Sequence, residues 1–385
     1  MMLQLNRYNE RKKLSGKEGE YKQEFNNLKE NYINKNNLFK KATPIGVDRC
    51  RFISKELEID SDIYKMHLEK GEKIEILDRA TGEIIGLSDF NMTINSTCLG
   101  GTDDYKIKIN ILETLNRGFL IDVNIPKVLY GTNEVNVSNL EDLSKVPAII
   151  EGELANVGVF IDMSTARITY LEVNINTNDE KVYGAMNLIR KAWNKTDEKI
   201  FITELKNRQE SLMKKNNHLK IKVYDKIKQL TDTKQTTINE NLVRIELSTK
   251  HGEVIKRITK GNRTIKGLIE NWNKLESWFL KNLDKHVKKE CDNFIDEAIK
   301  NLARDLNGNK TYDVLFSHAE QGNLIDIELF EVAMKQYYKE VGKKSPYTMI
   351  KNTKKRLEAI NPERYKQLQG NINALDSLWS EIGLK

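Results

Sequence analysis

The chain of 385 residues has few cysteines and no long apolar runs. Its three cysteines, Cys50, Cys98 and Cys291, are scattered without paired spacing. Disulfide frameworks and cysteine zinc sites both need paired cysteines, so we exclude both and expect a reduced, cytoplasmic environment. No apolar run approaches the roughly 20 residues that span a bilayer, and the amino terminus lacks the apolar core of a signal peptide. These absences predict a soluble protein with no membrane partner.

Motifs of several catalytic classes are also missing. The histidines, His67, His218, His251, His286 and His318, are isolated from one another in sequence. There is no His-x-His pair, no zinc spacing, no P-loop and no Gly-x-Ser-x-Gly turn. A histidine metal site and an ATPase or helicase activity of the chain's own are therefore excluded.

Positive charge is abundant but unevenly distributed. The formal net charge is +7 and the isoelectric point is about 8.9. Residues 1–43 carry +5, residues 44–200 carry −8, and residues 201–250 and 251–385 carry +5 each. A basic balance favours polyanionic partners. This uneven distribution of charge predicts that a polyanionic partner binds residues 1–43 or the region after residue 200.

Hydrophobic periodicity divides the chain into three parts. Residues 1–43 read as a basic extension. Between residues 44 and 250, short alternating runs are separated by helical patterns, as in Phe119–Ile125 and Arg167–Asn176. This order predicts an α+β domain with a largely antiparallel sheet and flanking helices. From residue 251 to 385 helical periods replace the alternation, which predicts an all-helical C-terminal region.

The most informative stretch is 218–228, which alternates strictly. Leu219, Ile221 and Val223 fall on one face of a strand, and the other face carries Lys220, Lys222, Tyr224 and Lys226. A phosphodiester backbone would be attracted to the lysines, and the phenol would then lie beside a phosphate. The alternative is a solvated strand with lysines outside.

Carboxylates add a second candidate feature. If the predicted strands share one sheet, Asp122, Glu172 and Glu246 project from the same polar face as Tyr224, with Arg244 beside them. Carboxylates roughly 5 Å apart on neighbouring strands repel one another unless a cation lies between them. Because Mg²⁺ and Mn²⁺ prefer oxygen ligands, the pattern suggests a magnesium or manganese site. The alternative is the solvated side of a sheet.

Four segments follow one another in a fixed order between residues 45 and 250. They are V-N-I-P-K-V-L-Y-G-T-N (123–133), R-I-T-Y-L-E-V (167–173), L-K-I-K-V-Y-D-K (219–226) and L-V-R-I-E-L (242–247). In this order and spacing they resemble the replication initiators of filamentous phages, the II/X family, and related plasmid proteins. Tyr170 stands where the family usually has arginine, and Ile245 replaces its usual aromatic residue.

The resemblance implies a rolling-circle initiator that nicks one strand at a phage or plasmid origin. It implies Tyr224 as the nucleophile, Lys226 as its accompanying lysine, and Arg244 and Glu246 as a later pair, with Glu172 in place of the family's aspartate. The product would be a 5′-phosphotyrosine and a free 3′-hydroxyl. Such an endonuclease acts on origin DNA in the cytoplasm of a bacterial host cell, with the host helicase and polymerase. The residues expected to contact DNA are Lys214, Lys215, Lys220, Lys222 and Arg244.

Two other functions compete with this interpretation. A non-catalytic, origin-binding regulator on the same fold would use the basic extension, the lysine row and the helical region equally well. Ser345-Pro346 before Tyr347 is a plausible helix start, and with the preceding helix it could form a DNA-reading pair, although helix pairs more often serve packing alone. An RNA-binding protein is a weaker alternative because there is no aromatic platform motif.

Overall fold

The computed structural model describes most of the chain after residue 44. The described residues are 45–54, 57–59, 74–77, 84–88, 91–94, 107–111, 119–130, 136–155, 159–177, 182–193, 200–205, 209–226, 243–321, 324 and 326–384. The predicted basic extension, residues 1–43, lies outside them.

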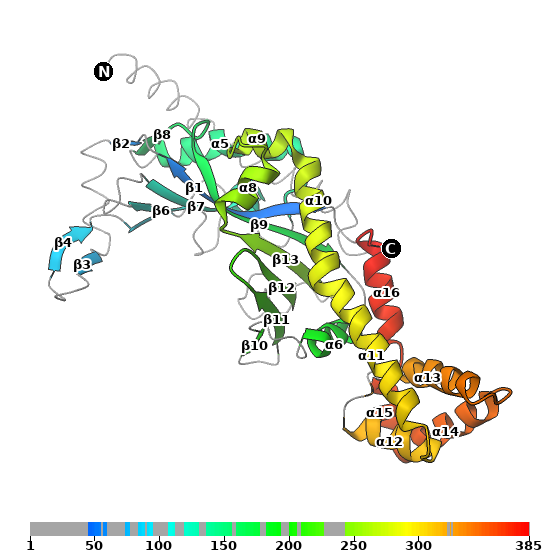
Figure 1. Ribbon diagram of the computed structural model, residues 1–385. Coiled ribbons are helices and arrows are strands. Elements are labelled where there is room, and N and C mark those ends of the chain that lie inside the picture. Colours follow the sequence, from blue (N-terminus) through cyan, green and yellow to red (C-terminus); the bar gives the residue numbers. More distant parts are fainter. Residues whose placement is uncertain are drawn as a thin grey trace.

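The predicted α+β fold is confirmed. Its centre is a nine-stranded sheet of order β10-β11-β12-β13-β9-β1-β7-β6-β5, in which every neighbouring pair is antiparallel. Figure 1 shows this sheet with helices packed around it. The strands are β1 (Gly46–Ser54), β5 (Asn91–Ile94), β6 (Ile107–Ile111), β7 (Phe119–Asn124), β9 (Arg167–Thr177), β10 (Ile200–Leu205), β11 (Gln209–Lys215), β12 (Lys220–Asp225) and β13 (Val243–Thr249). Two small ladders pair β2 (Leu57–Ile59) with β8 (Val159–Ile161), and β3 (Ile74–Leu77) with β4 (Ile84–Ser88).

One face of the central strands forms the core. On β9 and β13, Val173, Ile175, Ile245 and Leu247 alternate with polar residues and are at most 4% exposed. Each such side chain contributes about 1.5–3 kcal/mol on burial. This alternation is the reason the strands adopt a single register, since a slip of one residue would turn every apolar side chain outward.

Helices occur both in the α+β half of the chain and in the region after β13. In chain order they are α4 (Ile125–Tyr130), α5 (Leu140–Ala155), α6 (Val182–Trp193), α8 (Gly252–Ile258), α9 (Ile265–Glu270), α10 (Trp272–Leu283), α11 (Lys289–Asp305), α12 (Thr311–Glu320), α13 (Ile327–Glu340), α14 (Tyr347–Ile360), α15 (Pro362–Gln367) and α16 (Asn371–Glu381), with a π-helical segment η3 (Asp284–Lys288) between α10 and α11. Everything after β13 is helical in the described residues, as predicted.

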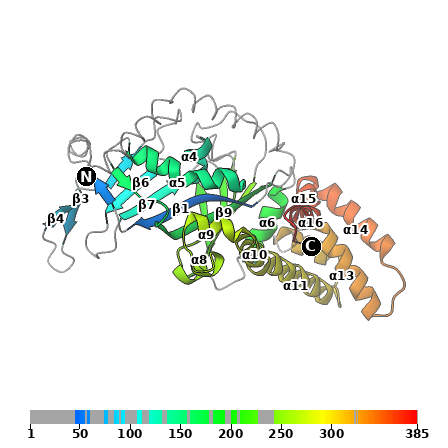
Figure 2. The same cartoon turned by 90° about the horizontal axis from the view of Figure 1, so that it is seen from above.

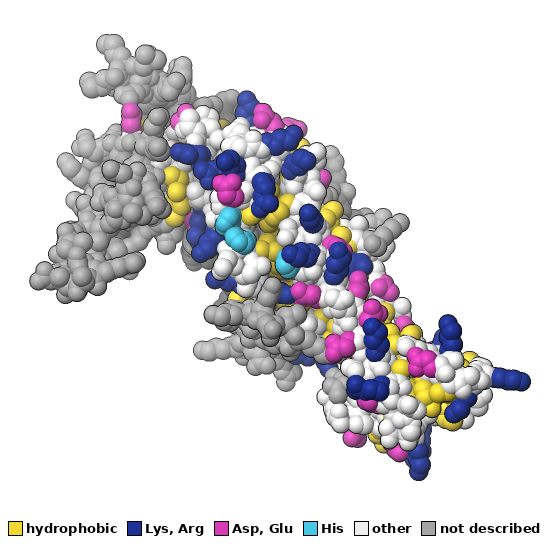
Figure 3. All heavy atoms as spheres, in the orientation of Figure 1, with side chains coloured by type: hydrophobic (Ala, Val, Ile, Leu, Met, Phe, Trp, Pro, Cys, Tyr) yellow, Lys and Arg dark blue, Asp and Glu magenta, His cyan; other side chains and the backbone are white. Residues whose placement is uncertain are grey.

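A long helix connects the sheet to a terminal bundle. Helices α10, η3 and α11 follow one another without a break and run from the sheet to the small bundle of α12–α15 (Figures 1 and 2). Lys and Arg side chains project from the surface of that bundle (Figure 3). Helix α16 then returns to pack on α6, and the Thr177 hydroxyl at the end of β9 donates to Glu381 at 2.6 Å. The helical region therefore contacts the α+β half directly.

Several elements differ from the predicted ones. Strands β2, β5, β8, β10 and β11 have patterns too short or too irregular to be predicted. Within the helical region, the continuous helical pattern of residues 362–378 forms two helices, because Gly370 adopts a left-handed conformation with φ of 75° between α15 and α16. The continuous pattern of residues 264–283 is likewise interrupted at Asn271.

Candidate active site

One face of the sheet carries the polar residues predicted from the sequence. Directly opposed residues of antiparallel strands point to the same face. On β1, Arg51 lies opposite Asp122 of β7, and Arg49 lies opposite Glu172 of β9. Asp122 and Glu172 therefore share a face across three neighbouring strands.

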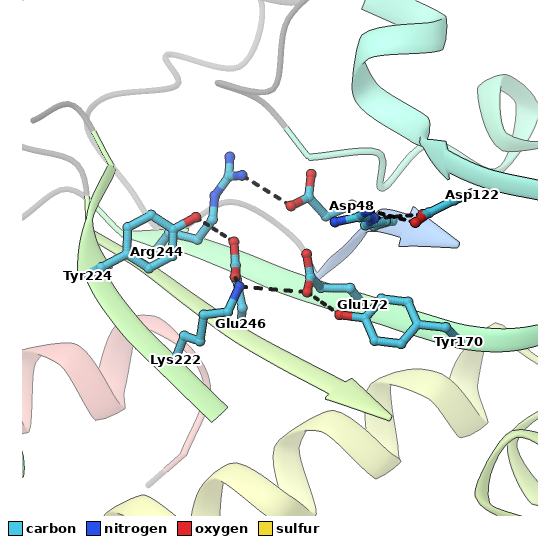
Figure 4. A network of polar contacts seen from close by, with 9 residues as sticks. Asp48, Asp122, Tyr170, Glu172, Lys222, Tyr224, Arg244 and Glu246 are labelled. Atoms are coloured by element: carbon cyan, nitrogen blue, oxygen red, sulfur yellow. Dashed lines mark hydrogen bonds and ion pairs between the residues drawn. The ribbon is translucent and has the colours of Figure 1, made fainter. Parts of the chain in front are cut away.

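The same face continues across β13 and β12. Asn174, two positions along β9, lies opposite Glu246, which in turn lies opposite Lys222. Tyr224 lies opposite Arg244. All four residues predicted to share the polar face do so, and the helices that follow β13 lie on the other side of the sheet (Figure 4).

A β-bulge brings a further carboxylate to this face. The register of β1 against β9 shifts between Val47 and Arg49, so Asp48 is an extra residue without a ladder partner. Bulges re-aim side chains next to functional sites. The side chain of Asp48 is buried and points toward Glu172 and Glu246 in Figure 4. The sequence signal that we missed is the pair of consecutive polar residues that interrupts the alternation of β1.

Three buried carboxylates meet where the bulge faces β9 and β13. Asp48, Glu172 and Glu246 each offer one oxygen, and the three oxygens lie within 4.8 Å of one another. Asp48 Oδ1 and both amide atoms of Asn174 are buried without a hydrogen-bond partner among the described residues. Polar atoms buried in this way normally have a partner. An oxygen-rich set with orphaned oxygens fits Mg²⁺ or Mn²⁺, which the three carboxylates would hold.

Two cations partly balance this acidic cluster. Lys222 Nζ lies 2.7 Å from Glu246 Oε2 and 3.8 Å from Glu172 Oε2. Arg244 is fully buried, and its Nη1 lies 3.5 Å from Asp48 Oδ2. Buried charges are costly unless they are compensated. When all three carboxyl groups are ionised they outnumber these two cations by one, and a bound metal cation would balance that charge.

The pKa values of the carboxyl groups diverge. Burial, and next the negative charge of Glu246, raise the pKa of Glu172 to about 7. Burial likewise raises the pKa of Asp48, partly offset by Arg244. Burial would also raise the pKa of Glu246, but Lys222 and Arg244 outweigh it and the pKa is lowered. Glu172 therefore titrates near neutral pH, Asp48 is shifted in the same direction, and Glu246 stays ionised.

Tyr224 is attached directly to this cluster. Its hydroxyl donates a short hydrogen bond to Glu246 Oε1, and its side chain is buried, with 8% exposure. Lys226 Nζ lies 5.8 Å from the centre of the ring. Burial, and next Arg244, lower the pKa of Lys226 to about 7, so its amine is largely neutral above that pH.

Lys222 and Lys226 do not by themselves favour the phenolate of Tyr224. Burial, and next the charge of Glu246, raise the pKa of Tyr224 well above 10. Ionisation of the phenol would need additional positive charge at Glu246.

A second tyrosine is bound to the cluster from the opposite side. The Tyr170 hydroxyl donates to Glu172 Oε2 at 2.5 Å, and the Arg51 guanidinium lies 5.0 Å from the centre of the Tyr170 ring. Burial, and next Glu172, raise the pKa of this phenol as well. Any test of Tyr224 therefore needs Tyr170 as its control.

Asp122 lies on the predicted face but not in the cluster. Arg49 donates to its two carboxylate oxygens at 2.7 and 2.6 Å, and Arg51 donates at 2.9 Å. Two guanidinium groups thus neutralise Asp122, and Asp48 supplies the third carboxylate in its place. The predicted metal set of Asp122, Glu172 and Glu246 is corrected accordingly.

The predicted DNA-contacting residues separate into two groups. Lys214 points to the apolar face, is 3% exposed and forms a short ion pair with Glu290 of α11, so its predicted DNA contact is wrong. Arg244 is also fully buried and cannot contact DNA from this position. In contrast, Lys215 is exposed and lies directly opposite the half-buried Lys220. Together with Lys222 these two lysines form a basic row, defined here as Lys215, Lys220 and Lys222.

Comparisons with known proteins give little. No family model and no curated protein matches the chain. Among solved structures, a rolling circle replication initiator protein from Geobacillus stearothermophilus is similar over 53% of this chain and 73% of its own, with 14% sequence identity and a TM-score of 0.25. A similarity this weak carries no conclusion about fold or function. In the described part of the chain, no helix combines the length and apolar character of a membrane span.

Proposed function

We propose that the chain is a metal-dependent DNA nicking and rejoining enzyme that initiates rolling-circle replication at a phage or plasmid origin. The observation that carries the proposal is the hydrogen bond from the Tyr224 hydroxyl to a cluster of three buried carboxylates. A tyrosine that serves only packing needs no such cluster, whose burial costs several kcal/mol per charge. Desolvated, mutually perturbed ionisable groups are typical of sites that perform chemistry.

The proposed reaction is an in-line attack by Tyr224 Oη on the scissile phosphorus. The P–O3′ bond breaks, leaving a 5′-phosphotyrosine and a 3′-oxygen that takes a proton from water. The phenol proton passes to the amine of Lys226, which is largely neutral above pH 7. Mg²⁺ or Mn²⁺ held by the carboxylates would neutralise charge on the phosphate. Because the phosphotyrosine conserves the bond energy, attack by a 3′-hydroxyl can later rejoin the strand.

The basic row gives the DNA strand a place to bind. Lys215 and Lys220 are like charges directly opposite each other, a pairing that destabilises a sheet unless an anion lies between them. A phosphate backbone along these lysines would lead to Lys222 and the acidic cluster. The 3′-hydroxyl would be extended by the host polymerase, and strand separation would fall to a host helicase.

A non-catalytic, origin-binding role remains the second candidate. The observation in its favour is that Tyr224 is buried, its hydroxyl is already bonded to Glu246, and its pKa is raised. A regulator that kept the fold would retain this arrangement as a structural network.

Covalent capture separates the two candidates. The full chain is incubated with Mn²⁺ and a pool of 3′-labelled single-stranded oligonucleotides with a randomised centre, and denatured protein is examined for label. The enzyme retains the 3′ fragment as an adduct, and sequencing that fragment identifies the nick site. A supercoiled plasmid carrying that site should then become a nicked circle. Complete absence of adduct with both Mg²⁺ and Mn²⁺ would favour the regulator.

A further inference from the structure

The terminal bundle carries a basic surface that the acidic cluster does not use. Residues 341–357, which cover the turn after α13 and most of α14, contain six lysines and arginines and no acidic residue. The whole of α14 lies on the outside of the bundle, at the far end of the molecule (Figure 2).

Helix α14 is fixed to the bundle by one narrow face. Its buried residues are Ile350, Thr353 and Leu357, which recur at helical spacing. The opposite face consists of Thr348, Lys351, Asn352, Lys355 and Ala359, all of them exposed. Because Thr348, Asn352, Lys355 and Ala359 are spaced by four, three and four residues, they form a single row along the helix. This set of five exposed residues is called the α14 stripe below.

Two further basic residues of α14 contact neighbouring helices. Lys354 forms a short ion pair with Glu331 of α13, and the Arg356 guanidinium stacks 3.6 Å from the centre of the Tyr312 ring on α12. These two contacts hold the helix at a fixed rotation. Lys351 and Lys355 are therefore left projecting outward from a rigid support.

We infer that α14 lies in the major groove of duplex DNA and reads its sequence with the α14 stripe. The inference rests on the proposed function only in taking DNA as the partner. An α-helix with side chains is about 10–12 Å wide and the major groove is about 12 Å wide. The stripe also has suitable chemistry: asparagine pairs with adenine, the methyl groups of threonine and alanine contact thymine, and the two lysines can bind phosphates of the backbone.

The composition of the stripe favours DNA over a protein partner. Protein interfaces depend on aromatic or large apolar anchors, and the exposed ones of α14, Tyr347, Met349 and Ile360, lie outside the stripe, near the two ends of the helix. The stripe offers instead two amines, an amide, a hydroxyl and a methyl group. The exposed carboxylate of α14, Glu358, lies in the last turn of the helix, beside Ala359. The preceding turn adds Lys344, which is exposed and lies beside the start of the helix.

The position of α14 predicts where the recognised sequence lies. The first part of the long helix lies along the α+β half, since Trp193 of α6 donates to the His286 carbonyl and Lys214 of β11 pairs with Glu290. Beyond Glu290, residues 291–305 of α11 extend about 22 Å, at 1.5 Å per residue, before the bundle begins. At 3.4 Å per base pair this corresponds to about 7 base pairs, so the sequence read by α14 should lie at least that far from the nick, as a separate element.

The test is selection of binding sites by the full chain in excess chelator, so that nicking has no part in it. The probe is a pool of 30-base-pair duplexes with a randomised centre, and affinity for the enriched duplex is measured at several salt concentrations. Lys351→Ala/Lys355→Ala should bind all duplexes about 10- to 100-fold more weakly, and its log–log salt slope should fall by about 2. Asn352→Ala should lose preference at one base position with the salt slope unchanged.

Matched controls exclude general loss of charge or of folding. Lys266→Ala/Lys300→Ala removes two exposed lysines from α9 and α11, and it should bind the duplex as the unmodified chain does. Thermal melting should be the same for every variant. If the α14 variant binds duplex normally, or if its only defect is lost self-association in sedimentation, the inference is wrong. Since binding is measured without metal, a chain that never nicks could still pass this test.

Discussion

Two charged regions of the molecule differ in how their charges meet water. In the acidic cluster, Asp48, Glu172 and Glu246 are at most 7% exposed, and their pKa values are pushed apart. In the α14 stripe, Lys351 and Lys355 are exposed. A buried charge costs desolvation free energy and has a perturbed pKa. An exposed charge costs little free energy, and salt screens its interactions. We therefore assign the proposed nicking reaction to the acidic cluster and DNA affinity to the α14 stripe.

The largest expected effect is that of Tyr224→Phe. Because phenylalanine has no atom to attack phosphorus, the covalent adduct should disappear completely. Duplex binding at α14 should be unchanged, since the ring and its strand remain. The measurement is label retained by denatured protein, beside binding in chelator.

Tyr170→Phe is the control for that experiment. It removes the other hydroxyl bonded to the cluster, at Glu172, and should leave the adduct in place. If the adduct instead persists in Tyr224→Phe and vanishes in Tyr170→Phe, the nucleophile is Tyr170.

Glu246→Gln should have the next largest effect. Removing one carboxylate from the cluster should slow nicking by about 1000-fold, the several kcal/mol that a metal ion supplies to such a transition state. A second readout does not need activity: Mn²⁺ should raise the melting temperature of the unmodified chain and not that of Glu246→Gln. Equal stabilisation of both proteins by Mn²⁺ would remove the metal from this cluster.

Lys214→Met tests whether this lysine stabilises the fold or contacts DNA. Without Lys214, Glu290 loses this ion pair in a largely buried position, so we expect a loss of about 2–3 kcal/mol in unfolding free energy. Lys214→Met/Glu290→Leu should recover most of that loss. The slope of log affinity for DNA against log salt concentration should not change. A slope smaller in magnitude by about 1 would mean that Lys214 contacts DNA.

The smallest expected effect is a pH dependence at Glu172. Its pKa of about 7 in the fold lies above its usual 4.5, so between these values the folded state binds more protons than the unfolded state. Stability is therefore lost as pH rises through this window, and glutamine, which cannot ionise, avoids the loss. In chelator, Glu172→Gln should gain about 1–3 kcal/mol on the unmodified chain between pH 4.5 and 7.5, measured by denaturant unfolding. No gain would mean that Glu172 does not titrate in this window.

Much of the sheet could be predicted because its central strands alternate regularly. In β9 and β13 apolar residues occupy every second position, so both the strand and its buried face follow from the pattern. The co-facial placement of Glu172, Tyr224 and Glu246 follows from the same rule. Strand β11 could not be found in this way, because Q-E-S-L-M-K-K shows no clear alternation.

The exact membership of the cluster was beyond pattern analysis. Asp48 reaches it only through a bulge, and the bulge depends on the register of β1 against β9 rather than on β1 alone. Asp122 obeys the alternation, but cross-strand arginines bind it. Likewise the burial of Lys214 and Arg244 depends on α11 and on Asp48, which are distant in sequence. Periodicity predicts which residues share a face of the sheet. Contacts with residues distant in sequence decide which charged side chains on that face are available to bind a metal ion or DNA.

The π-helical segment η3 sets the rotation of everything that follows it. A π turn inserts one residue into an α-helix, and each helical residue turns the chain by about 100°. Deleting one residue from Asp284–Lys288 would restore a regular helix and swing α11 and the bundle by that angle. Glu290 would leave Lys214, and α16 could no longer reach both α6 and Thr177. The inserted residue in η3 therefore determines the rotation of the terminal bundle relative to the sheet, and with it the direction in which α14 faces.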